Sequence, residues 1–154
     1  MLPSLGDPAP ARPLWLVCED GTEYVTRFAR FLGGEFRFAR VGGAAALLAA
    51  AASAQGVVLD LDFRRTPPEE LVDERGEAHP ALEPDERRRL SESQGILILR
   101  ALRAGGSRLP ALLCADLDDP GQVAFLEATL APLRIVPSTE SLAALAARLR
   151  AATP

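Results

Sequence analysis

Apolar residues along this chain fall into two alternating patterns. Five short apolar runs predict β-strands, and the segments between them carry apolar residues every three or four positions, which is typical of amphipathic helices. The pairs Gly33-Gly34 and Gly105-Gly106 end two of the helical segments. The predicted strands cover residues 13–18, 35–41, 56–61, 109–115 and 133–136, and the predicted helices cover residues 22–32, 44–55, 96–102, 122–130 and 138–152.

Regular alternation of strands and helices predicts an α/β fold, in which a parallel sheet is covered by helices on both faces. Right-handed crossovers make such a sheet doubly wound and place its function at the carboxyl ends of the strands. Ser138 or Thr139 is predicted to cap the last helix, ahead of Ser141. One domain is expected over residues 13–152, after a flexible leader at residues 1–12 that does not resemble a signal peptide.

A long insertion at residues 64–94 interrupts the alternation after the third strand. It is rich in Pro, Glu, Asp and Arg, and residues 85–93 are predicted to form a short helix. Its few apolar residues cannot form a core of their own, so we expect the insertion to contribute little to stability. It is expected to cover the end of the third strand or to present a binding surface. Those apolar residues are Leu71, Val72, Leu82 and Leu90.

Composition narrows the classes of function. The chain has 154 residues, a formal net charge of −4 and a pI of about 5.1, so it offers no basic surface for nucleic acid. It has no apolar run long enough to span a membrane, and a cytoplasmic location is expected. Cys18 and Cys114 lie in predicted strands and are expected to be buried free thiols. All 17 basic residues are arginine.

Acidic residues follow two of the predicted strands. Glu19 and Asp20 come after the first strand, and Asp60 and Asp62 end the third. If these strands are neighbours, the carboxylates repel one another unless a proton or a hard divalent cation such as Mg²⁺ intervenes. Alternatively, each acid is a solvated turn residue. If the acids do cluster, they predict a metal site formed by Glu19, Asp20, Asp60 and Asp62.

Several motifs in order resemble response-regulator receiver domains of the CheY-like type. LVCEDG resembles the end of the receiver first strand, with Glu19 and Asp20 in the place of the metal-binding acids. VVLDLDF resembles the third strand, with Asp60 in the place of the phosphoacceptor, and Gly95 matches a helix-starting glycine. The resemblance covers residues 14–149 and also rests on LPALLCAD and LRIVPS. It implies a flavodoxin-like (βα)5 sheet of order 2-1-3-4-5, with Asp62 offering its backbone carbonyl to the metal.

The chain departs from the receiver pattern at the positions that carry its chemistry. Cys114 stands where receivers have a Ser or Thr that contacts the phosphoryl group, and a thiol is a weak donor. Val136 stands in the place of the receiver lysine, so the cation that neutralises phosphoryl charge is missing. Arg64 or Arg65 is an alternative source of that cation. The resemblance with these departures implies a pseudo-receiver whose phosphotransfer to Asp60 is impaired or lost.

Such a module implies a protein partner in a bacterial two-component pathway, either a signalling kinase or effector or a second copy of the chain. The contact surface implied by the resemblance includes Phe125, Leu126, Leu133, Ile135 and Leu145, and Arg87, Arg88 and Arg89 are an alternative docking patch. Two other functions stay open at this point. One is an intact receiver phosphorylated on Asp60, and the other is a toprim-like nuclease that uses Glu19, Asp60 and Asp62 with a metal. His79 lies in the insertion and is expected to be a surface residue.

Overall fold

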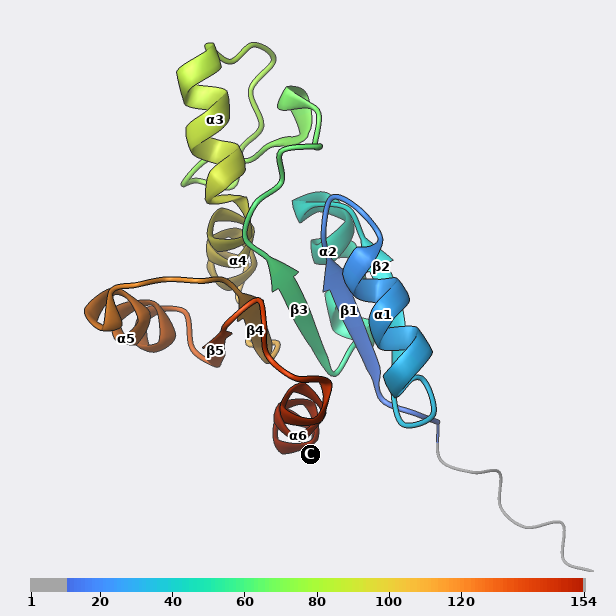
Figure 1. Cartoon of the computed structure of the whole chain (residues 1–154). Coiled ribbons are helices and arrows are strands. Elements are labelled where there is room, and N and C mark those ends of the chain that lie inside the picture. The colour runs from blue at the N-terminus through green and yellow to red at the C-terminus, as the bar shows by residue number, and fades with distance from the viewer. Residues whose placement is uncertain (1–10, 154) are drawn as a thin grey trace, which may run out of the picture.

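The sheet that the sequence predicts is present. A computed structural model describes residues 11–153, so most of the predicted leader lies outside the described residues. Five parallel strands have the order β2-β1-β3-β4-β5 (Figure 1), which confirms the doubly wound, flavodoxin-like fold. The strands are β1 (Leu14–Cys18), β2 (Arg37–Val41), β3 (Gly56–Asp60), β4 (Ala111–Cys114) and β5 (Leu133–Val136).

Helices cover both faces of the sheet and form two cores. Alternate residues of a strand point to opposite faces, so Val57 and Leu59 pack in the core with α2 and α4, while Val58 packs in the core with α1 and α6. Asp60 has the same parity as Val58 and therefore points to the face of α1 and α6. The helices are α1 (Glu23–Leu32), α2 (Ala44–Ala50), α3 (Pro84–Glu92), α4 (Gln94–Ala104), α5 (Pro120–Thr129) and α6 (Leu142–Ala152), with 3₁₀ turns η1 (Ala51–Ser53) and η2 (Pro68–Glu70).

The start of the last helix differs from the prediction. α6 begins at Leu142, and its N-cap is Ser141, whose Oγ accepts a hydrogen bond of 3.1 Å from the Ala144 amide. The prediction of Ser138 or Thr139 as the cap was wrong: α6 starts later in the chain, and the Ser138 hydroxyl is directed to Asp116. Within residues 11–153, no helix has the length and apolar character needed to cross a membrane.

The insertion belongs to the main core, contrary to the expectation that it contributes little to stability. Leu71 and Leu90 are 0% exposed, and Val72 is buried with them against β3 and α4. The Phe63 amide donates to the Ser91 carbonyl at 2.8 Å, which closes the base of the insertion. The sequence argument failed because isolated apolar residues do not need a core of their own when they complete one that the sheet already provides.

Candidate functional site

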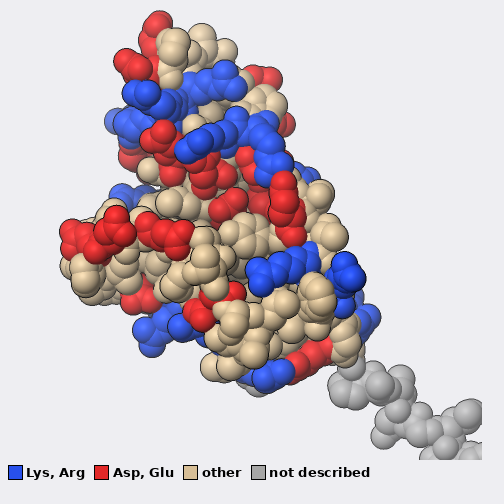
Figure 2. All heavy atoms as spheres, in the orientation of Figure 1, with Lys and Arg blue, Asp and Glu red and all other residues tan. Residues whose placement is uncertain are grey.

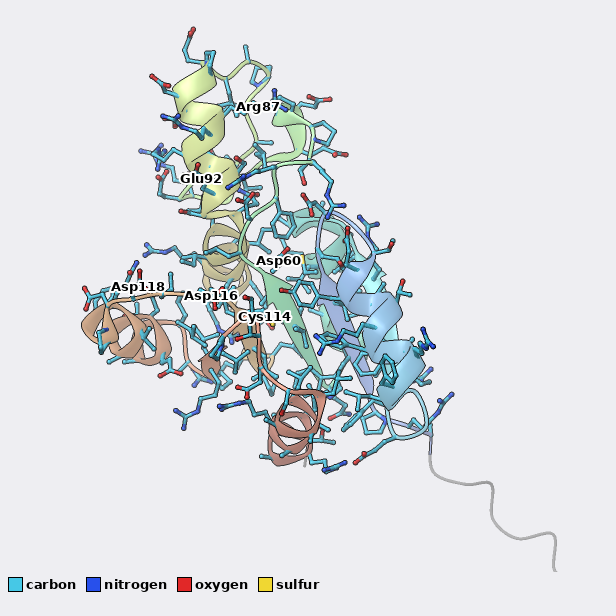
Figure 3. The ribbon with its side chains drawn as sticks, in the orientation of Figure 1. Asp60, Arg87, Glu92, Cys114, Asp116 and Asp118 are labelled. Atoms are coloured by element: carbon cyan, nitrogen blue, oxygen red, sulfur yellow. The ribbon has the colours of Figure 1, made fainter. Side chains whose placement is uncertain are left out.

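Asp60 lies at the carboxyl end of β3, in line with two other residues on neighbouring strands. In the sheet register Asp60 pairs with Cys114 of β4, and Cys114 pairs with Val136 of β5. Figure 3 shows Asp60 and Cys114 at the ends of their strands. Cys114 and Val136 are buried in the α1/α6 core. The three positions that the resemblance singled out are therefore adjacent in space.

Asp60 is half-buried, and its environment disfavours its charge. Its Oδ1 accepts one hydrogen bond, of 2.9 Å, from the Leu61 amide. Burial, together with the nearby charges of Asp20, Glu19 and Asp62, raises the pKa of Asp60 to about 6, although the bond from the Leu61 amide acts in the opposite direction. Because the folded-state pKa lies above the ordinary value, this group favours folding at low pH, and that contribution is lost as the pH rises through about 6.

The Cys114 thiol offers little chemistry to Asp60. Burial raises the pKa of Cys114 to about 12, and the charge of Asp60 adds to this effect. The thiol therefore stays protonated near neutral pH and is a poor nucleophile. Cys18 is also a free, buried thiol, and β3 separates its strand from that of Cys114, as the sequence predicted.

Glu19 does not face Asp60 as a metal ligand. It is 1% exposed, and its two carboxylate oxygens accept hydrogen bonds of 3.0 and 2.8 Å from the amides of Tyr24 and Val25 in the first turn of α1. These bonds satisfy amides that have no partner inside the helix. Burial nonetheless raises the pKa of Glu19. The structure thus gives Glu19 a role in holding α1, which differs from the metal-ligand role that the sequence suggested for it.

Asp20 and Asp62 are each paired with an arginine of the insertion. Asp20 accepts the Arg65 amide at 2.9 Å and the Arg65 guanidinium at 3.0 Å. Asp62 accepts the Arg64 amide at 3.0 Å and the Arg64 guanidinium at 2.7 Å. Neither arginine therefore brings a free cation to Asp60. The sequence pointed to these two arginines as sources of the missing cation, but it did not predict that they pair with Asp20 and Asp62.

The four acids do not assemble into the predicted metal site. Within residues 11–153, no group of three or more His, Cys, Asp or Glu side chains is arranged to hold a metal ion. Three of the four acids are instead directed to other donors: Glu19 to amides of α1, and Asp20 and Asp62 to arginines of the insertion. Among the described residues at the carboxyl end of the sheet, Asp60 is therefore not part of the oxygen cage that Mg²⁺ requires.

Asp116 and Ser138 form a second contact at this edge of the sheet, which sequence reasoning missed. The Ser138 amide donates a bond of 2.9 Å to Asp116 Oδ1, and its hydroxyl contacts the other carboxylate oxygen. These bonds lower the pKa of Asp116. They join the loop after β4 to the loop after β5, next to Cys114 and Val136. Asp116 lies just after the carboxyl end of β4, as Asp60 lies at the carboxyl end of β3. That position in the sequence could have marked Asp116 as a residue of this edge.

His79 lies in the insertion, as predicted. Its Nε2 is 2.6 Å from Asp73 Oδ2, and the pair is partly buried. The bond lowers the pKa of Asp73 to about 2. The pair stabilises the turn from Asp73 to Glu77, whose amide also bonds to Asp73. It contributes nothing to the edge of the sheet that carries Asp60.

Comparison with solved structures finds the same fold in receiver domains. The Francisella response regulator 1452 receiver domain is 14% identical, with a TM-score of 0.63 over 92% of this chain and 96% of that one. The BeF3-activated receiver domain of Klebsiella pneumoniae RstA is 20% identical, with a TM-score of 0.60 over 90% and 96%. Vibrio cholerae CheY4 is 12% identical, with a TM-score of 0.62 over 92% and 99%. No family model and no curated protein sequence matches the chain.

These similarities confirm the receiver-like fold that the motifs predicted. At 12–20% identity they establish the fold and leave the chemistry to the residues of this chain.

Proposed function

We propose that this chain is a receiver-like signalling module that acts by binding a protein partner in the cytoplasm, with phosphotransfer to Asp60 impaired or lost. The observation that supports this proposal is the row Asp60, Cys114 and Val136 across β3, β4 and β5. The row has an acid in the acceptor position but neither a hydroxyl group nor a cation beside it.

Electrostatics argue against a stable acyl phosphate in this row. A phosphoryl group on Asp60 brings up to two negative charges to a half-buried position that already lies near other carboxylates. Transfer requires cations that neutralise this charge. Arg64 and Arg65 are committed to Asp62 and Asp20, and Val136 is buried and uncharged.

A phosphodonor assay tests the proposal. The wild-type protein is incubated with acetyl phosphate and Mg²⁺, and Asp60 is examined by mass spectrometry of the intact protein and of its peptides. We expect no phosphate to accumulate, because the charge on the phosphoryl group is not compensated. Stoichiometric phosphate on Asp60 would instead establish an intact receiver, which is the second candidate.

A pair of lysine variants checks the alignment behind this expectation. Val136→Lys, combined with Cys114→Thr, should permit measurable phosphorylation of Asp60, since it supplies the missing cation and hydroxyl group. Ile135→Lys is the matched control, because Ile135 packs against the opposite core of the same strand. Equal phosphorylation of both variants would contradict the proposed place of Val136.

The partner surface that we favour lies on the insertion. A groove of about 520 Å³ lies there, and its lining has three arginines and one acid: Arg64, Arg87, Arg88 and Glu92, together with Leu82, Pro68, Pro84 and Ser91. Arg64 and Arg88 are exposed, and Arg87 forms no ion pair within the described part of the chain. Figure 2 shows arginine side chains gathered on this part of the molecule. An acidic segment of a partner protein matches this surface in charge and can contact its apolar floor.

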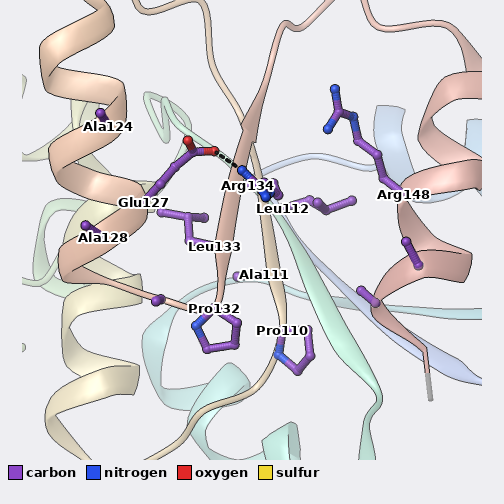
Figure 4. A pocket seen from close by; sticks show the side chains of 13 residues that line it. Pro110, Ala111, Leu112, Ala124, Glu127, Ala128, Pro132, Leu133, Arg134 and Arg148 are labelled. Carbon is purple, nitrogen blue, oxygen red and sulfur yellow. Dashed lines mark ion pairs between the residues drawn. The ribbon is translucent and has the colours of Figure 1, made fainter.

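The alternative surface is the groove between α5 and α6 along β5 (Figure 4). It measures about 710 Å³ and is lined by small apolar residues, with Arg134 and Arg148 at its edges. Arg134 is held by an ion pair of 3.9 Å with Glu127. Of the apolar residues predicted to form this surface, Leu126, Leu133 and Leu145 are buried in the core, while Phe125 is 61% exposed.

Paired surface variants separate the two grooves. The tagged wild-type chain is used as bait in an extract of the source organism, and the captured protein is quantified by mass spectrometry. Arg87→Glu with Arg88→Glu should reduce capture by about tenfold, because close like charges repel an acidic partner. Phe125→Ala, the control, should leave capture unchanged. The reverse result would place the partner on the α5–β5–α6 surface.

A further inference from the structure

Arg65 joins three separate segments of the chain through one side chain. Its guanidinium donates to Glu23 Oε1 at 2.7 Å, to Glu23 Oε2 at 3.0 Å and to Asp20 Oδ1 at 3.0 Å. Its own backbone amide donates to Asp20 Oδ2 at 2.9 Å. The Asp20 side chain is 5% exposed. Arg65 thus links the insertion to the loop after β1 and to the start of α1.

Gly21 provides the space in which this contact forms. A methyl group at position 21 would collide with the Arg65 guanidinium and with Glu23 Oε2. The backbone at Gly21 does not have a positive φ, so the glycine is not required by its backbone conformation. The absence of a side chain at this position is what lets the guanidinium approach Asp20.

The carboxylates at the carboxyl end of the sheet already accept hydrogen bonds from groups of the chain. Both oxygens of Glu19 accept amides of α1, and both oxygens of Asp20 accept donors of Arg65. Oδ1 of Asp60 accepts the Leu61 amide. Of the carboxylate oxygens of Glu19, Asp20 and Asp60, only Asp60 Oδ2 accepts no hydrogen bond from a described residue.

We propose that the guanidinium of Arg65 is a built-in counter-ion, which takes the place of a divalent cation at Asp20 and fastens the insertion to α1. Mg²⁺ requires near-octahedral oxygen ligands at about 2.0–2.1 Å, and a cation at Asp20 would lie beside the Arg65 guanidinium, whose positive charge repels it. The guanidinium is part of the chain, so it competes at a high effective concentration. This inference concerns cation binding and does not depend on the proposed partner function.

Removal of the guanidinium tests this inference. Mg²⁺ is titrated into the wild-type protein and into Arg65→Met, with isothermal titration calorimetry and the Mg²⁺-dependent change in Tm as measurements. The wild type should show neither signal up to about 10 mM, above the range of weak protein cation sites. Arg65→Met should bind Mg²⁺ at least about tenfold more tightly, because the negative charge of Asp20 then has no compensating charge beside it.

Two further variants separate this effect from a general loosening of the insertion. Arg89→Met is the matched control, because Arg89 also pairs with two acids of the insertion, Glu74 and Glu86, away from Asp60. It should gain no Mg²⁺ binding. Gly21→Ala keeps Arg65 but displaces it, and should gain Mg²⁺ binding as Arg65→Met does. The proposal would be overturned if the wild type bound Mg²⁺. It would also be overturned if Arg65→Met and Gly21→Ala both failed to gain Mg²⁺ binding.

Discussion

Replacement of Leu71 by alanine should lower the free energy of unfolding by about 2–5 kcal/mol. Leu71 is 0% exposed and packs in the core that β3 and α4 share, although it belongs to the insertion. The loss combines the transfer free energy of the side chain with the cavity left behind. For a domain of this size it corresponds to a fall in Tm of about 5–15 °C, measured by thermal denaturation followed by circular dichroism.

Two other substitutions in the insertion serve as controls for the effect of Leu71→Ala on stability. Leu82 is only partly buried, so Leu82→Ala should cost less than Leu71→Ala. Arg75 is exposed, and Arg75→Ala should leave Tm nearly unchanged. If all three variants had the same small effect, the insertion would be outside the cooperative unit of the fold, as its composition first suggested.

The same reasoning predicts that a short linker cannot replace the insertion without cost. The Gln94 side chain donates to the Val72 carbonyl at 3.1 Å and accepts the Val72 amide at 2.8 Å, and all of these groups are buried. Removing residues 66–84 therefore leaves the Gln94 side-chain oxygen without its donor, leaves only the Leu90 carbonyl for the Gln94 amide group, and exposes the apolar surface that Leu71 covers. A buried polar group without a partner costs about 1–3 kcal/mol in addition to the lost packing.

Replacement of Gly95 by alanine should destabilise the protein by about 1–3 kcal/mol, even though alanine favours helices. Gly95 lies in the first turn of α4, and its amide donates to the Leu61 carbonyl at 3.0 Å. A Cβ atom there would collide with the backbone carbonyl of Asp60. Because backbone atoms cannot rotate away, α4 or the end of β3 must move.

This prediction is checked by chemical denaturation and has a clear control. Gly34→Ala places its methyl group where no atom lies within 4 Å, so its effect should stay within about 0.5 kcal/mol. A neutral Gly95→Ala would mean that α4 tolerates a shift away from β3. In that case the position of Asp60 would not depend on close contact with this helix.

The order and type of most elements could be predicted from the sequence because they depend on local patterns of burial. Runs such as GVVLD are apolar on both faces, which is the pattern of a central strand in a parallel sheet. Parallel strands bring their carboxyl ends to one edge, so the positions of Asp60, Cys114 and Val136 in one row followed from the strand order. The resemblance to receiver domains singled out Gly95, and the structure shows why a glycine is needed there: a side chain would collide with the Asp60 carbonyl.

Only the tertiary structure decided which partner each charged group has. Arg65 meets Asp20 across 45 residues of chain, and Ser138 meets Asp116 across 22. Glu19 turns to the amides of α1, although its sequence position is equally consistent with a metal ligand. Many alternative pairs of arginine and acid have similar energies in water, so composition and spacing do not distinguish them. Packing of the insertion against β3 and α4 selects one arrangement, in which Asp20 and Asp62 pair with arginines while Asp60 forms no ion pair among the described residues.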